Sequence, residues 1–137
     1  GDNIPLEMHT EIRSRECCTK SSTLAINLAR KYGSRLHVLH LTTKDEVDFF
    51  SNDNNVSNKL ITAEVCIHHM LYSKKDYARK KGFIKCNPSI KEESDRLGLI
   101  EGVKNNNIDV IATDHAPHLK SEKSGKYEAT LLRKWEM

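Results

Sequence analysis

The fold class depends first on the stretch Arg35-Leu-His-Val-Leu-His-Leu-Thr42, whose centre is apolar apart from two histidines. The run is too short for a helix and is flanked by stop signals, so it favours a strand buried on both faces. Upstream, residues 14–32 place apolar side chains at helical spacing, and Gly33 stands where the C-terminal cap of a helix belongs. A capped helix that leads into a buried strand is typical of α/β proteins.

Two further stretches have the same strand character. Residues 60–66 are apolar and β-branched, and residues 108–113 form a third apolar run. The segment Thr43-Lys-Asp-Glu46 has the pattern of a capping box and predicts a short helix through Phe50. The other expected elements are a surface loop over 51–58, a helical turn over 74–81, a short extended segment over 83–88 and a helix over 91–103.

Strands that alternate with helices predict right-handed β-α-β connections and a parallel sheet within a single segment, residues 1–137. In such sheets the reactive groups lie beyond the carboxyl ends of the strands. The three expected strands end respectively at His40, at His68-His69 and at Asp114-to-His118. These strands and the residues at their ends hold six of the seven histidines, His37 of the first strand included. The sequence therefore predicts a functional site at the carboxyl edge of the sheet.

Composition excludes several classes of protein. The 22 Lys and Arg residues exceed the 19 Asp and Glu by only three and are scattered, so a nucleic-acid partner is not expected. No apolar run approaches the roughly 20 residues that cross a bilayer, so a membrane protein is not expected either. The four cysteines are not spaced as C-x-x-C pairs, and we expect them to be reduced in a cytoplasmic protein (Cys17, Cys18, Cys66 and Cys86).

His37 and His40 form an H-x-x-H pattern. On a regular strand, side chains alternate between the two faces, so these two histidines should point in opposite directions. His40 lies nearer the carboxyl end and is the better candidate for a metal ligand, whereas we expect His37 to pack outward under a helix. A histidine held by structural hydrogen bonds is the alternative for His40.

Asp114 is a strong candidate because it directly follows an apolar strand, where a carboxylate must be solvated, paired or metal-bound. The alternative is that Thr113-Asp114 only caps the start of a helix. His118 could be a metal ligand, a general base or an anion binder. His68 and His69 are weaker candidates because adjacent side chains diverge, and we expect one of them to be structural.

Histidine and aspartate at strand ends are suited to metal-assisted hydrolysis. Zinc accepts imidazole nitrogen and carboxylate oxygen, and it lowers the pKa of bound water to roughly 7. A catalytic zinc usually takes about three protein ligands, so one histidine and one aspartate make an incomplete site.

Several motifs, in order along the chain, together resemble the dihydroorotases of the amidohydrolase superfamily, closest to the bacterial long-chain type. They are Ile12-Arg-Ser14, Leu36-to-Thr42, Thr62-Ala-Glu-Val-Cys66 with His68-His69, Lys85-Cys-Asn-Pro88, and Ala112-Thr-Asp-His-Ala-Pro-His118. The last is the most specific. The resemblance runs from about Ile4 to Lys123 and corresponds to the C-terminal half of the catalytic barrel.

This resemblance implies a partial TIM-type (β/α)8 barrel and a centre of one or two zinc ions. The implied reaction is the reversible closure of N-carbamoyl-L-aspartate to L-dihydroorotate in pyrimidine synthesis. By motif match, His40 and Asp114 would be metal ligands, and Asp114 would also be the catalytic acid/base. Asn87 would hydrogen-bond the pyrimidine ring, and His118 would bind the substrate carboxylate.

The family's other metal ligands would precede Gly1, and a whole barrel takes about 250 residues. We therefore expect a fragment that is inactive alone, whose open sheet edges favour association, including a homo-oligomer. Residues 127–137 depart from the family and read as a helix with Leu131 and Trp135 on one side. Two alternatives stay open: a hydantoinase- or allantoinase-like amidohydrolase, and a metal-free scaffold subunit.

Overall fold

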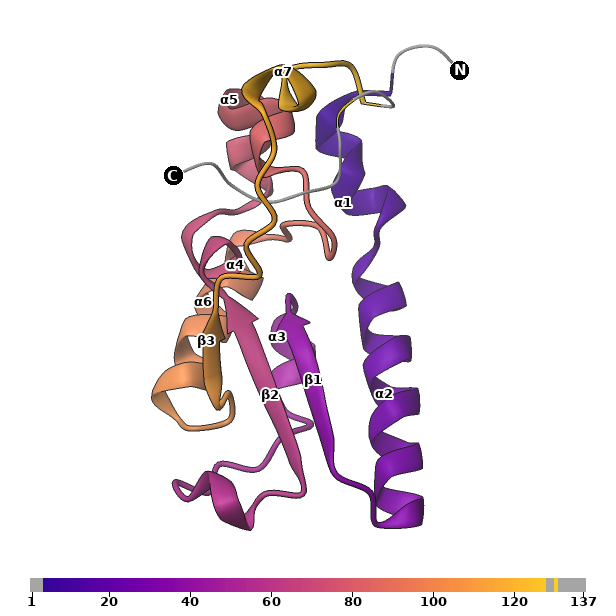
Figure 1. The fold of residues 1–137 in the computed structure, drawn as a ribbon, viewed down its shortest axis with the longest axis vertical. Coiled ribbons are helices and arrows are strands. Elements are labelled where there is room, and N and C mark those ends of the chain that lie inside the picture. Colours follow the sequence, from indigo (N-terminus) through magenta and orange to yellow (C-terminus); the bar gives the residue numbers. More distant parts are fainter. Residues whose placement is uncertain (1–3, 128–129, 131–137) are drawn as a thin grey trace.

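The computed structural model describes residues 4–127 and residue 130. Its centre is a parallel sheet of three strands in the order β1-β2-β3 (Figure 1). The strands are β1 (Leu36–Leu41), β2 (Ile61–Cys66) and β3 (Val110–Ala112). Both pairs of neighbouring strands are parallel, as the alternation of strands and helices predicted.

The helices are α1 (His9–Ile12), α2 (Arg15–Tyr32), α3 (Lys44–Val47), α4 (Ile67–Leu71), α5 (Tyr77–Lys80), α6 (Glu93–Lys104) and α7 (Lys120–Lys123). Short 3-10 turns occupy Leu6–Met8, Val56–Asn58, Lys74–Asp76 and Lys81–Ile84. Helix α2 is confirmed together with its end, because Gly33 adopts the left-handed conformation and its N–H binds the last turn. Helix α6 is confirmed within two residues of its expected start.

Local capping decides where α3 begins. The hydroxyl of Thr43 accepts the backbone N–H of Glu46, and the Glu46 carboxylate accepts the N–H of Thr43, which completes the predicted capping box. Ser22 of α2 also donates to this carboxylate and so ties α2 to α3. The helix is shorter than expected, because after Val47 the chain continues as a turn through Phe50.

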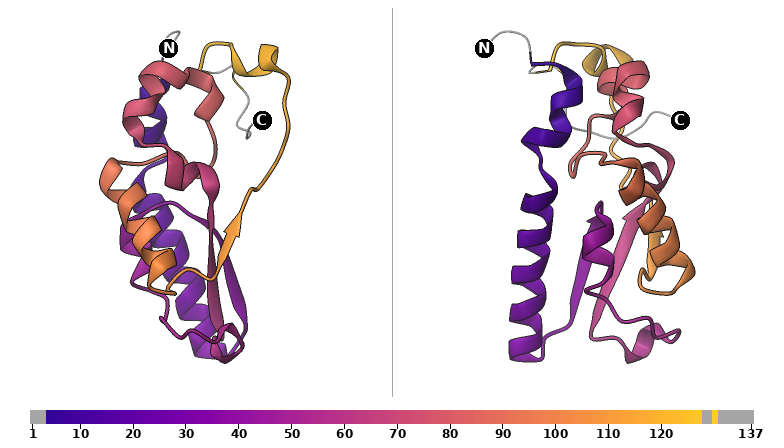
Figure 2. Two further views of the ribbon diagram at one scale, coloured as in Figure 1. Left: turned by 90° about the vertical axis from the view of Figure 1, so that its left-hand side faces the viewer. Right: turned by 180° about the vertical axis from the view of Figure 1, so that it is seen from behind.

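Helices α2, α3 and α6 cover one face of the sheet, and the opposite face carries no helix among the described residues (Figure 2). The core lies between the sheet and these helices. Its buried side chains are Ile26, Leu41, Val47, Phe50, Ala63, Val65, Leu99 and Ile108. A sheet covered on one side only is the arrangement of a segment cut from the wall of a barrel.

A second, smaller apolar cluster lies beyond the carboxyl ends of the strands, where Figure 1 shows α1, α5 and α7. It contains Tyr77, Ile84, Cys86 and Ile90, with Tyr72 packed against it.

The expected extended segment over 83–88 is wrong in its first half, because Phe83 and Ile84 belong to a 3-10 turn. The helix expected over 127–137 lies outside the described residues, apart from Tyr127 and Thr130.

Candidate functional site at the carboxyl edge of the sheet

His40 sits in a β-bulge of β1. Val38 pairs with Ala63 and Leu41 with Val65, so three steps along β1 match two steps along β2, and one extra residue is inserted. His40 has a φ of 43°, in the left-handed region that a non-glycine residue rarely adopts. The bulge therefore breaks the alternation of β1 at the residue that the sequence singled out as a metal ligand.

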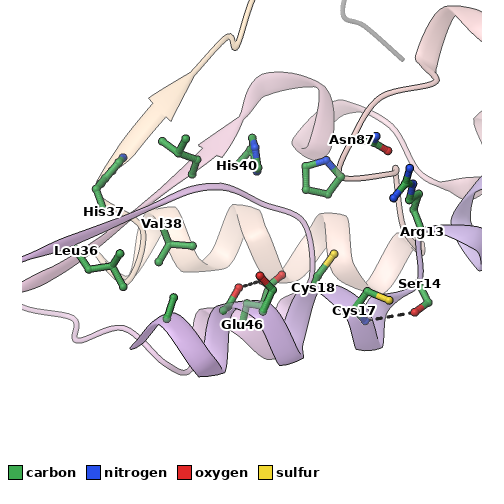
Figure 3. A pocket seen from close by; sticks show the side chains of 15 residues that line it. Arg13, Ser14, Cys17, Cys18, Leu36, His37, Val38, His40, Glu46 and Asn87 are labelled. Carbon is green, nitrogen blue, oxygen red and sulfur yellow. Dashed lines mark hydrogen bonds between the residues drawn. The ribbon is translucent and has the colours of Figure 1, made fainter. Parts of the chain in front are cut away.

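The bulge corrects the prediction for His37. Figure 3 shows His37 and His40 on the same side of β1, with Val38 on the other side, facing the helices. His37 does not pack under a helix. Its Nδ1 lies 2.8 Å from Thr62 Oγ1 and its Nε2 lies 3.3 Å from Glu64 Oε2, on the open face, which is the face of the sheet that carries no helix among the described residues. The alternation rule gave the wrong side for one histidine because it assumes a regular strand.

Glu64 is a residue of this site that the sequence reasoning missed. It lies at the middle of β2, and its side chain is only 13% exposed although the open face has no covering helix. One carboxylate oxygen accepts the backbone N–H of His40 at 3.3 Å, and the other faces His37. A lone carboxylate inside an apolar strand was the available signal, because such a group must find partners.

Asp114 follows β3 by two residues and has a φ of 46°. Four described non-glycine residues have positive φ, and His40 and Asp114 are two of them, with Lys81 and Asn106. Strained backbone of this kind gathers at functional sites. With strands about 4.8 Å apart, the backbones of β1 and β3 lie about 10 Å apart across β2, and their carboxyl ends share one edge.

Asn87 lines a cavity of about 500 Å³ between α2 and the edge of β1. His37 and His40 line the same cavity, whereas Asp114 and His118 do not (Figure 3). The buried Oδ1 of Asn87 has no hydrogen-bond partner among the described residues. The structure thus brings Asn87 and His40 together and leaves an acceptor atom of Asn87 available to a ligand.

His118 lies just before α7. Its Nδ1 is 2.9 Å from Glu122 Oε2, and its buried Nε2 has no hydrogen-bond partner among the described residues. The contact with His118, together with the N–H of Leu119, lowers the pKa of Glu122. A carboxylate that accepts the Nδ1–H fixes the imidazole ring and leaves Nε2 as its other polar atom.

His68 and His69 are both buried, in α4. Their rings lie against each other, with centroids 4.3 Å apart, so the adjacent side chains converge here rather than diverge.

His9, which the sequence did not single out, is also buried. Its Nε2 donates to the Cys86 carbonyl at 2.8 Å, and its Nδ1 lies 2.9 Å from the Tyr127 hydroxyl.

The donor types at the carboxyl edge suit zinc, because His40 offers imidazole nitrogen and Asp114 offers carboxylate oxygen. These two donors are one short of the about three protein ligands that a catalytic zinc takes. Their donor types are therefore those that zinc accepts, and the cavity that His40 lines does not include Asp114.

The chain is similar to dihydroorotases from several microorganisms. It is 32% identical to that of Methanosarcina acetivorans over 128 residues, which cover 90% of this chain and 27% of the relative. It is 41% identical to that of Geobacillus thermodenitrificans over 102 residues, which cover 74% of this chain and 24% of the relative. The chain is a relative of the dihydroorotases. It spans about a quarter of the length of the curated dihydroorotases that it matches, and no family model matches it.

Solved structures confirm the fold class of this dihydroorotase relative. The D-hydantoinase (dihydropyrimidinase) of a Thermus species superposes with a TM-score of 0.82 at 19% identity, over 98% of this chain and 30% of that one. A dihydroorotase of Saccharomyces cerevisiae superposes with a TM-score of 0.70 at 19% identity, over 80% of this chain and 31% of that one. The chain is therefore part of a TIM-type barrel. Among the described residues, no helix is both long and apolar enough to cross a membrane.

Proposed function

We propose that the intact protein is a zinc-dependent dihydroorotase that interconverts L-dihydroorotate and N-carbamoyl-L-aspartate in pyrimidine synthesis. The observation that carries the proposal is the similarity to dihydroorotases across 90% of the chain, which includes the strand ends with His40 and Asp114. The strained backbone of both residues supports a functional role. By itself the 137-residue chain should be inactive, because it offers two of about three zinc ligands.

In this proposal His40 and Asp114 would hold zinc, which would supply Lewis acidity and lower the pKa of water. Asp114 also moves a proton to the ring nitrogen that leaves when the cyclic amide opens, and it takes the proton back on closure. Its exposed position at the strand end suits this task, because a proton carrier must reach the substrate.

Asn87 and His118 bind the substrate. The Oδ1 of Asn87 can accept an N–H of the pyrimidine ring, because this buried atom has no other partner among the described residues. In the imidazolium form, the Nε2–H of His118 can donate to the substrate carboxylate while the Nδ1–H donates to Glu122. Both substrates carry such a carboxylate.

Turnover of L-dihydroorotate by the full-length protein, with zinc analysis and a chelator, tests the proposal. Asp114→Asn should lower kcat by at least about 100-fold, because general acid–base catalysis contributes about 10²–10⁴-fold. His118→Gln should mainly raise KM. Asp53→Asn, in the exposed loop before β2, is the control and should change neither constant. Full turnover by Asp114→Asn would contradict the assignment.

A hydantoinase-like activity is the rival, because the chain superposes on a D-hydantoinase as well as on the yeast dihydroorotase. At 19% identity these superpositions bear on the fold alone. A carboxylate-binding His118 favours dihydroorotate. A panel of dihydroorotate, hydantoin and allantoin distinguishes the two, and a preference for an uncharged ring would overturn the proposal.

A metal-free scaffold subunit is the second rival. Full-length protein without stoichiometric zinc and insensitive to chelators would support it. We also expect a cytoplasmic homo-oligomer with small molecules as its only ligands, and the mass of the purified particle in solution tests the oligomer.

A further inference from the structure

Three buried donor side chains meet where β2 runs into α4. Cys66 is 0% exposed, and His68 and His69 are each 2% exposed. Each contributes one ligand atom, either a ring nitrogen or the sulfur, and the three atoms all lie within 4.8 Å of one another. We propose that Cys66, His68 and His69 form a second metal site, selective for a thiophilic ion such as Zn²⁺.

The donor chemistry supports a thiophilic ion. Thiolate and imidazole ligands suit zinc, whereas Mg²⁺ and Ca²⁺ prefer oxygen. In a tetrahedral site, zinc bonds of about 2.0–2.3 Å place two donors about 3.5 Å apart. The three donor atoms lie within 4.8 Å of one another, so they would have to close by about 1 Å at most to bind an ion. Binding releases the proton of the Cys66 thiol.

His69 is oriented by the backbone. Its Nε2 donates to the carbonyl oxygen of Pro88 at 3.0 Å, so in the neutral ring the lone pair is on Nδ1. A metal-binding histidine commonly donates its other ring N–H to a carbonyl, which fixes the tautomer and the direction of the ring. The Pro88 carbonyl serves this role, and Nδ1 is the atom that we assign to the metal.

The site is separate from the zinc site of the proposed function. His40 and Asp114 belong to the ends of β1 and β3, whereas Cys66 ends β2, and the two donor sets share no residue. A bound ion would join the end of β2 to α4 and, through His69, to the loop that carries Asn87. The second site therefore does not rest on the proposed reaction.

Titration of the metal-free full-length protein with Co²⁺ tests the site, because only a thiolate ligand produces a sulfur-to-cobalt charge-transfer absorption. We expect one equivalent of Co²⁺ to produce this band and Zn²⁺ to displace it. Cys66→Ser should abolish the band, and His69→Ala should weaken binding by at least about 10-fold. Cys18→Ser, which removes a half-buried thiol of α2, is the matched control and should keep the band.

Absence of the band in the wild-type protein, or its persistence in Cys66→Ser, would overturn the site. The wild-type titration decides even if a variant fails to fold. A second readout is the melting temperature, which Zn²⁺ should raise less in Cys66→Ser than in Cys18→Ser. The proposed catalytic ligands include no thiol, so loss of dihydroorotate turnover with the band intact would count against the proposed function alone.

Discussion

The carboxylate of Glu64 accepts the backbone N–H of His40 at 3.3 Å while its other oxygen faces His37 Nε2 at the same distance. The N–H belongs to the bulged residue, whose φ of 43° removes it from the regular pairing of β1 with β2. Glu64 thus stabilises the strained backbone that carries a proposed metal ligand, and it does so from the neighbouring strand.

Glu64→Ala should weaken metal binding at the proposed catalytic site by about 10- to 100-fold, the usual effect of losing a group that orients a ligand. Glu64→Gln should have a smaller effect, since its amide oxygen can still accept the His40 N–H. The zinc affinity and the kcat of the full-length protein, measured for each of the two variants, test both expectations. Glu101→Gln, on the exposed side of α6, is the control. A Glu64→Ala protein with unchanged affinity would show that His40 needs no such support.

His9 should make stability depend on pH. Burial, reinforced by the nearby positive charges of Lys85 and Arg13, lowers the pKa of His9 from 6.5 to about 4. Between these values the unfolded chain takes up a proton that the folded protein excludes. The contribution of His9 to the free energy of unfolding is therefore fully present above pH 6.5 and is lost as the pH drops towards 4, by about 3 kcal/mol at most. Urea unfolding across this range measures the slope.

His9→Gln should remove the part of the pH dependence of the unfolding free energy that comes from His9, because glutamine does not titrate. His115→Gln replaces an exposed histidine and should leave the slope as it is. Equal pH dependence in His9→Gln and the wild type would mean that other groups cause the acid sensitivity.

Lys59 and Asp109 form a buried ion pair. Lys59 Nζ lies 2.7 Å from Asp109 Oδ1, and the side chains are 0% and 2% exposed. The second Asp109 oxygen accepts the N–H of Ala63 at 2.9 Å, which fixes the segment before β3 against β2. Lys59→Met should cost about 3–5 kcal/mol of unfolding free energy, because it leaves a buried charge uncompensated.

The exposed pair of Lys104 and Glu101 in α6 offers the matched comparison. Lys104→Met should change stability by less than about 1 kcal/mol, as is usual for a surface ion pair. Equal losses for Lys59→Met and Lys104→Met, measured by urea unfolding, would refute the energetic importance of burial here.

Leu41→Ala should also be strongly destabilising. Leu41 is 1% exposed in the core between the sheet and its helices, so truncation leaves a cavity and should cost about 2–5 kcal/mol. Leu24→Ala, at a position 63% exposed on α2, should change the unfolding free energy by less than about 1 kcal/mol. Thermal unfolding of the two variants compares them directly, and similar melting temperatures would place Leu41 outside the core.

The sequence was sufficient for the elements whose causes are local. Helix α2 ends at Gly33 because only a residue that tolerates left-handed φ continues the chain there. Thr43 and Glu46 open α3 because their side chains satisfy the first N–H groups of the helix. The turn over 83–84 was missed because its apolar residues also fit a strand, and packing beside Tyr77 and Ile90 selected the turn.

In the candidate site, too, some features follow from the sequence and others only from the tertiary structure. The sequence by itself determined that a histidine lies near the end of one strand and that an aspartate follows another, because strand patterns and their ends can be read from hydrophobicity. The expectation of strands buried on both faces is wrong, because residues of β1 and β3 are exposed. Only the tertiary structure decided that His37 shares a face with His40, that Glu64 joins them, and that Cys66 meets His68 and His69. These relationships depend on the register between strands and on one inserted residue, and neither is encoded in the pattern of a single strand.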